Sequence, residues 1–192
     1  MIFNIPNSLT WARILLIPIF VGVFYAPHDV LARSEQNMLA TALFVLAAIT
    51  DWFDGYLARA LGQTSAFGAF LDPVADKLMV AAALIVLVQL DRADAVIAFV
   101  IIGREIAISA LREWMAKIGA ARSVAVSFVG KVKTTAQMVA IPMLLFHDHL
   151  FGLDLQRLGT WLIWVAALLT LWSLGYYMKM AWPELSGERD PR

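Results

Sequence analysis

The residues best suited to chemistry are four aspartates in the segment TDWFDGYLARALGQTSAFGAFLDPVADK, namely Asp51, Asp54, Asp72 and Asp76. Apolar runs flank this segment, MLATALFVLAAI before it and LMVAAALIVLVQL after it. Asp51 and Asp54 are three residues apart and Asp72 and Asp76 are four apart, and both spacings place side chains on one face of a helix. Two helices joined by the short turn GQTSA would therefore bring all four carboxylates to the same depth.

Four carboxylates in a partly desolvated site repel one another unless a cation neutralises them. Oxygen ligands of this kind suit Mg²⁺, Mn²⁺ or Ca²⁺, and the chain has no cysteine for a thiolate zinc site. Two such ions would stabilise an in-line displacement at phosphorus. The alternative is a hydrated interfacial loop in which the aspartates pair with Arg59 and Lys77, which explains paired helical spacings less well.

The composition predicts an all-α integral membrane protein that positions these residues. The chain is 61% hydrophobic and 16% charged, with a mean hydropathy of +0.74. A spanning helix needs about 20 apolar residues, so one domain of six transmembrane helices fills residues 1–192. The predicted spans are 8–26, 36–61, 67–90, 94–117, 128–147 and 156–181, after an interfacial segment at about 1–10 and before a polar tail at about 183–192. We expect the tryptophans of the last span to serve mainly in packing.

The distribution of charge predicts the orientation. If GQTSA, KIGAARSVAVS and both termini share one side, 11 of the 15 lysines and arginines lie there, against Arg33, Arg92 and Arg157 opposite. The positive-inside rule then places both termini and the aspartates at the cytoplasmic face. Net charge is zero, and no feature indicates a nucleic-acid partner.

Small residues accompany the aspartates. Gly55 and Ala58 lie on or beside the face of Asp51 and Asp54, and a glycine inside a helix is unfavourable by about 1 kcal/mol unless another group must come close. That group is either a neighbouring helix or a ligand. Arg59 carries a forked set of donors suited to phosphate.

Written as a pattern, the segment reads D-x-x-D-G-x-x-A-R, eight residues, then G-x-x-x-D-x-x-x-D, which includes Gly68. This pattern resembles the signature of the CDP-alcohol phosphatidyltransferase family at every defined position. The resemblance implies a six-helix fold, usually dimeric, in the bacterial cytoplasmic membrane with its metal site open to the cytoplasm. It also implies transfer of a phosphatidyl group from a CDP-linked lipid to an alcohol, with release of CMP.

The resemblance also implies roles for individual residues. The four aspartates would be metal ligands for two Mg²⁺ or Mn²⁺ ions, and Asp76 would in addition be the general base for the attacking hydroxyl. The residues expected to bind the CDP-lipid, CDP-diacylglycerol, are Gly55, Ala58, Arg59, Gly68, Asn7, Thr10 and Arg13. For Asn7 the alternative is a cap of the first helix, and for Arg13 it is an anionic lipid head group.

Three further segments, FNIPNSLTWARILLIPIF, GREIAISALREWMAKIGA and GKVKTTAQM, resemble the bacterial branch of the family that uses glycerol 3-phosphate. A phosphorylated acceptor brings about two negative charges. The cations expected to bind them are Arg104, Arg112, Lys131 and Lys133. The alternatives are an internal pair of Arg104 with Glu105 or an aspartate, and interfacial positions for the two lysines.

Two other functions stay open at this point. The same chemistry could use another alcohol, as in cardiolipin-synthase-like or inositol-phosphate-type relatives, because the signature does not encode the acceptor. A divalent cation transporter would also place carboxylates within the membrane, but it needs polar groups at several depths. Here the acidic groups gather at one end of their helices.

Overall fold

The computed structural model describes residues 5–60, 62, 65–119 and 128–185. Within them lie six α-helices, as the hydropathy pattern predicts. The elements in chain order are α1 (Ile5–Gly22), the 3₁₀ turn η1 (Val23–Tyr25), α2 (Arg33–Ala60), α3 (Ala66–Gln89), α4 (Ala95–Lys117), α5 (Phe128–Phe146), the strands β1 (His149–Leu150) and β2 (Leu153–Asp154), and α6 (Leu155–Leu185).

Three of the described helices are long and apolar enough to cross a membrane, with apolar segments at Asn7–Tyr25, Arg33–Leu57 and Leu155–Pro183. Helices α3 and α4 carry charged residues inside them, including Asp72, Asp76 and Lys77 in the first half of α3, and Arg104 and Glu105 near the middle of α4. The chain is therefore a multi-pass membrane protein, and its helices α3 and α4 contain charged side chains.

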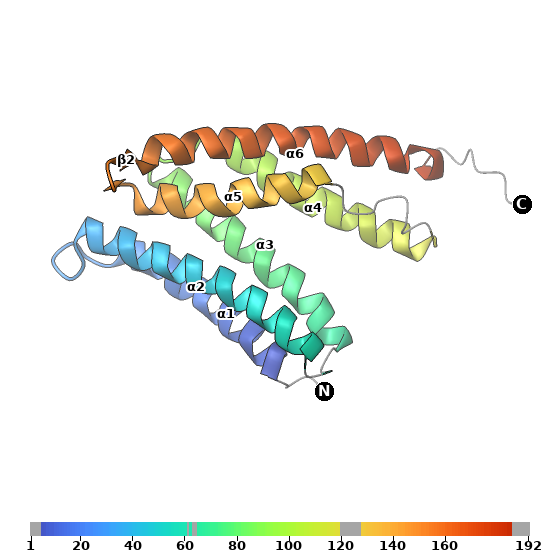
Figure 1. Ribbon diagram of the computed structural model, residues 1–192, viewed down its shortest axis with the longest axis horizontal. Coiled ribbons are helices and arrows are strands. Elements are labelled where there is room, and N and C mark those ends of the chain that lie inside the picture. The colour runs from blue at the N-terminus through green and yellow to red at the C-terminus, as the bar shows by residue number, and fades with distance from the viewer. Residues whose placement is uncertain (1–4, 61, 63–64, 120–127, 186–192) are drawn as a thin grey trace, which may run out of the picture.

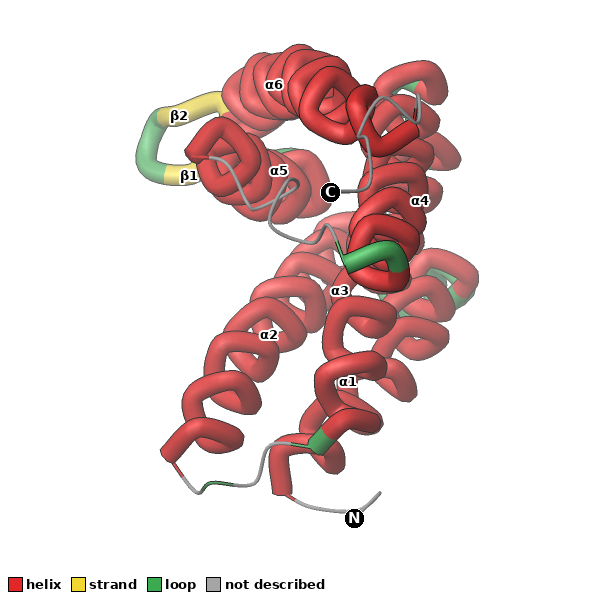
Figure 2. Tube along the Cα trace, turned by 90° about the vertical axis from the view of Figure 1, so that its right-hand side faces the viewer, coloured by secondary structure: helices red, strands yellow, loops and turns green. Residues whose placement is uncertain are grey.

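The helices form two groups that meet at one end and diverge at the other (Figure 1). Helix α1 packs along α2 and α3, whereas α6 packs along α5 and α4. The side view in Figure 2 shows the same separation, with α1 and α2 below and α5 and α6 above. The main apolar core joins the groups where they meet, and its fully buried members include Phe20, Leu84, Leu87, Ile101, Ile141 and Leu144.

Local caps determine where the charged helices begin. Ser65 accepts a hydrogen bond from the backbone N–H of Gly68 at 2.9 Å and so caps α3, and Asp94 accepts one from Val96 at 2.7 Å and caps α4. Asn7 does not cap α1, because α1 already begins at Ile5 and runs on without a break. The capping alternative for Asn7 is therefore wrong.

The end where the helices meet is held by Arg92, in the turn between α3 and α4. Its guanidinium donates to the backbone carbonyls of Leu144 and Leu145, at 3.3 and 2.7 Å, and to Asn37 Oδ1 at 2.8 Å. A cation at the C-terminal end of α5 also interacts favourably with the helix dipole. Burial lowers the pKa of Arg92 to about 10, so the side chain stays charged at neutral pH.

We expect Arg92→Ala to lower the stability of the protein by about 2–4 kcal/mol, because three hydrogen bonds from a charged donor are lost and two carbonyls lose a partner. Thermal unfolding of the detergent-solubilised protein measures this loss. Arg157→Ala is the matched control, since the Arg157 side chain is 85% exposed. Equal thermal unfolding midpoints for the two variants would contradict a stabilising role for Arg92.

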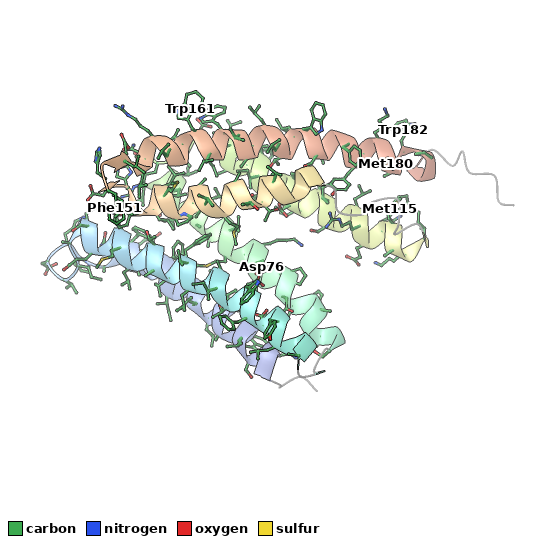
Figure 3. The ribbon with its side chains drawn as sticks, viewed as in Figure 1. Asp76, Met115, Phe151, Trp161, Met180 and Trp182 are labelled. Atoms are coloured by element: carbon green, nitrogen blue, oxygen red, sulfur yellow. The ribbon has the colours of Figure 1, made fainter. Side chains whose placement is uncertain are left out.

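The tryptophans of α6 do not pack inside this chain. Trp161, Trp164, Trp172 and Trp182 are 74%, 51%, 71% and 60% exposed. Figure 3 shows Trp161 and Trp182 on the side of α6 that faces away from the other helices. The packing expectation for these residues is wrong within a single chain, because the buried face of α6 is formed by other residues, including Ile163, Ala166, Thr170, Ser173 and Tyr177.

Candidate active site

The aspartates of α2 and α3 converge on Arg13 of α1. The Arg13 guanidinium donates to Asp51 Oδ1 at 2.9 Å, to Asp76 Oδ1 at 2.5 Å, and to Asp54 Oδ2. Arg13 is only 2% exposed. The turn between α2 and α3 thus brings carboxylates from positions 51–54 and 76 together around one cation, as their helical spacing predicts.

Asp72 is held separately, by Thr10 of α1. The Thr10 hydroxyl donates to Asp72 Oδ1 at 2.6 Å, and Thr10 is fully buried. One turn earlier on α1, Asn7 Nδ2 donates to Ser65 Oγ at 3.2 Å. A Cβ on Gly68 would lie 2.5 Å from Asn7 Oδ1, so this glycine allows α1 to approach the start of α3. Helix α1 therefore orders the acidic site through three polar residues.

The donor set fits a hard divalent cation. All four aspartates offer carboxylate oxygens, and three of them contact the Arg13 guanidinium. Among the described residues, however, no group of three Asp, Glu or His side chains is placed to hold an ion as it stands. The Arg13 guanidinium contacts three of these carboxylates, so we expect a bound ion to compete with it for them.

A second, basic cluster lies between α4, α5 and α6. Glu105 accepts from Lys133 Nζ and, at 3.4 Å, from Arg104 Nη1. Lys133 is 1% exposed, so the interfacial alternative for this lysine is wrong, whereas the alternative pair of Arg104 with Glu105 is present. Arg112 lies further along α4, and the Nε atoms of Arg104 and Arg112 are buried without a hydrogen-bond partner.

Two residues of α6 complete the basic cluster. Ser173 Oγ accepts from Arg104 Nη2 at 2.9 Å, and Tyr177 Oη accepts from Arg112 Nη2 at 3.3 Å. Neither residue was predicted from the sequence to belong to the site. A signal was present, since Ser173 and Tyr177 are polar residues four apart in an apolar helix and so share one face.

One cavity of about 300 Å³ connects the two clusters. Its lining includes Asp51, Asp76, Lys77, Arg104, Arg112 and Gln137. Figure 3 places Asp76 on α3, between the α1–α2 pair and the α5–α6 pair. The cavity thus has an acidic end and a basic end, which suits a ligand that reacts at one end and carries an anionic group at the other.

For most of the remaining predicted residues, the structure describes the backbone but not the side chain. Gly55 lies in α2 directly after Asp54. Ala58 and Arg59 lie in α2 and Lys131 lies in α5, but their side chains are outside the described part of the structure. Their predicted roles therefore stay predictions.

Comparison with known proteins identifies the class. Residues 3–172 match the family model of CDP-alcohol phosphatidyltransferase, which covers most of the chain. The chain belongs to this family, as the aspartate signature predicts, and it is an enzyme of the phosphatidyltransferase type. Members of the family are generally metal-dependent.

Relatives that match nearly the whole chain share one name. A Salmonella typhimurium protein named CDP-diacylglycerol–glycerol-3-phosphate 3-phosphatidyltransferase is 50% identical over 181 residues, which are 93% of this chain and 95% of that protein. Proteins of the same name from Escherichia coli and Shigella flexneri are each 49% identical over 185 residues, covering 95% of this chain and 97% of theirs.

Proposed function

We propose that this protein transfers the phosphatidyl group of CDP-diacylglycerol to glycerol 3-phosphate, forming phosphatidylglycerophosphate and CMP. The observation that carries the proposal is the cavity of about 300 Å³ that has Asp51 and Asp76 at one end and Arg104 and Arg112 at the other. The names of relatives that are 49–50% identical over nearly the whole chain support the same donor and the same acceptor.

At the acidic end, the acceptor hydroxyl attacks the phosphorus that carries diacylglycerol. Asp76 accepts the hydroxyl proton, a new oxygen–phosphorus bond forms, and the bond from that phosphorus to the bridging oxygen of CMP breaks. The Asp76 side chain is 43% exposed and lines the cavity, so a substrate hydroxyl can reach it. The remaining aspartates, Asp51, Asp54 and Asp72, are the proposed ligands, together with Asp76, of two Mg²⁺ or Mn²⁺ ions. When bound, such ions would neutralise the diphosphate and make CMP a better leaving group.

At the basic end, the charge count suits a phosphate dianion. Arg104, Arg112 and Lys133 carry three positive charges and Glu105 one negative charge, which leaves two positive charges for about two on the acceptor phosphate. Lys131, at the start of α5, is proposed to bind the acceptor phosphate as well. The residues proposed to bind the CDP-lipid are Gly55, Ala58, Arg59, Gly68, Asn7, Thr10 and Arg13.

We place the reaction at the cytoplasmic face of a bacterial cytoplasmic membrane. All six helices would span the bilayer as one domain, with both termini on the cytoplasmic side, because most lysines and arginines then lie there. A homodimer is proposed from the family resemblance alone. A cation transporter is not supported, since the chain belongs to an enzyme family and an apolar core closes the end opposite the aspartates.

Release of CMP tests the acceptor. With CDP-diacylglycerol and Mg²⁺ or Mn²⁺ present, we expect glycerol 3-phosphate to support CMP release at least tenfold faster than glycerol or serine at equal concentration, because only the phosphorylated alcohol pairs with the basic cluster. Equal rates with plain glycerol or serine would refute glycerol 3-phosphate as the acceptor. Absence of CMP release with any alcohol would refute the transferase activity itself.

A further inference from the structure

Tyr177 of α6 contacts both arginines of the proposed acceptor site. The Cζ atoms of Arg104 and Arg112 lie 5.7 and 5.3 Å from the centre of the Tyr177 ring. The ring is fully buried, and its hydroxyl accepts a hydrogen bond from Arg112. One aromatic ring therefore makes a cation–π contact with two like-charged groups at once.

Ser173, one turn before Tyr177 on α6, orients the first of these arginines. Its hydroxyl donates to the carbonyl of Thr170 at 2.9 Å, which leaves its lone pairs to accept from Arg104 Nη2. Ser173 is 1% exposed. The hydrogen bond to Thr170 thus turns the hydroxyl so that it can hold the guanidinium.

Arg104 and Arg112 need such support because they start far apart. Residues eight apart along an α-helix are separated by about 12 Å at the backbone. Their side chains are long and flexible, and the two positive charges repel each other. The aromatic face attracts both charges and brings them toward the same point, so less freedom is lost when an anion binds.

The cavity wall indicates how α6 acts. Arg104 and Arg112 line the cavity, whereas its described lining includes no residue of α6. Tyr177 and Ser173 therefore reach a bound ligand only through the arginines. Their effect is expected on the affinity for the acceptor and not on the transfer of the proton.

We propose that Tyr177, assisted by Ser173, is a positioning residue that holds Arg104 and Arg112 in the arrangement that binds the phosphate of the acceptor alcohol. The proposal rests on the proposed function, in which these two arginines bind the acceptor phosphate. It assigns to α6 a role in acceptor recognition.

Initial rates of CMP release test the proposal, with each substrate varied while the other is saturating. We expect Tyr177→Leu to raise the KM for glycerol 3-phosphate about tenfold, which is the size of two lost cation–π contacts. Tyr177→Phe keeps the ring and loses the hydroxyl, and Ser173→Ala loses one hydrogen bond, so each should raise that KM about threefold. The KM for CDP-diacylglycerol and the kcat should change less than about twofold.

Tyr176→Phe is the matched control. Tyr176 is 47% exposed and its ring contacts that of Tyr177 without reaching the arginines, so its KM values should match the parent protein. Inorganic phosphate is a second probe: it should inhibit the parent competitively against glycerol 3-phosphate, and more weakly in Tyr177→Phe and Ser173→Ala. If Tyr177→Leu does not fold, these two variants decide the outcome.

Unchanged acceptor KM in Tyr177→Phe and Ser173→Ala, or equal increases in both KM values, would overturn the positioning role. That result is distinguishable from failure of the proposed function. If the parent protein releases no CMP with glycerol 3-phosphate, the proposed function itself fails. If the parent is active and Arg104→Gln raises the acceptor KM while the α6 variants do not, only the role of α6 is lost.

Discussion

Replacing Asp76 by asparagine should abolish turnover while the protein still assembles in the membrane. The amide cannot accept the proton of the attacking hydroxyl, and a general base contributes about 10²–10⁴ to the rate. The side chain is nearly isosteric and keeps an oxygen toward Arg13, so the helices should pack as before. We expect less than about 1% of the parental rate of CMP release, with an unchanged elution profile in detergent.

Asp91→Asn is the matched control, because Asp91 lies in the exposed turn at the opposite end of α3 and should keep full activity. Asp76 is also a proposed metal ligand, so the rate should be measured up to saturating Mn²⁺. Activity that returns at high Mn²⁺ would limit Asp76 to metal binding. Retention of more than a few per cent of the parental rate without such dependence would remove Asp76 from the base role.

Replacing Arg13 by glutamine should make the stability of the protein depend on divalent ions. Without the guanidinium, Asp51, Asp54 and Asp76 face one another with no counter-charge. Breaking a buried pair of this kind costs about 3–5 kcal/mol, and the partial exposure of Asp51 and Asp76 should reduce that cost. In chelator, we therefore expect a lower thermal unfolding midpoint than that of the parent.

Added Mg²⁺ or Mn²⁺ should raise the midpoint of Arg13→Gln more than that of the parent. In the parent, an ion must first displace the guanidinium, so part of its binding free energy is spent on that step. Titration of either ion against the unfolding midpoint measures the difference, with Lys117→Gln as a control in an exposed ion pair. If the metal-dependent shift of Arg13→Gln is no larger than the parental shift, Arg13 and the ion do not compete for the carboxylates.

Much of the fold could be predicted from the sequence because membrane helices have a strong local signal. The six predicted spans correspond to α1–α6, with ends that differ by only a few residues. Asp51, Asp54 and Asp76 could be predicted to converge because helical spacing and a short turn are local properties. The family signature was equally local, and the family match confirms it.

Contacts between helices distant in the chain could not be predicted in the same way. Arg13 was expected at the CDP-lipid, but nothing in its neighbourhood along the chain indicates that it contacts three aspartates 38 to 63 positions away. Lys133 was expected at the acceptor phosphate, with an interfacial position as the alternative, but its spacing along the chain does not indicate that it pairs with Glu105 of α4. The tryptophans of α6 were misassigned because an apolar side chain in a membrane protein is equally suited to lipid and to the core.

By itself, the sequence determined the class of protein, the number of helices and the acidic half of the site, because each depends on composition or on spacing within one helix or across one short turn. Only the tertiary structure decided how the basic half is built. Arg104 and Arg112 of α4, Lys133 of α5, and Ser173 and Tyr177 of α6 come together through packing of three helices. The direction of a helix face toward its neighbours is set by the whole bundle, so no single segment encodes it.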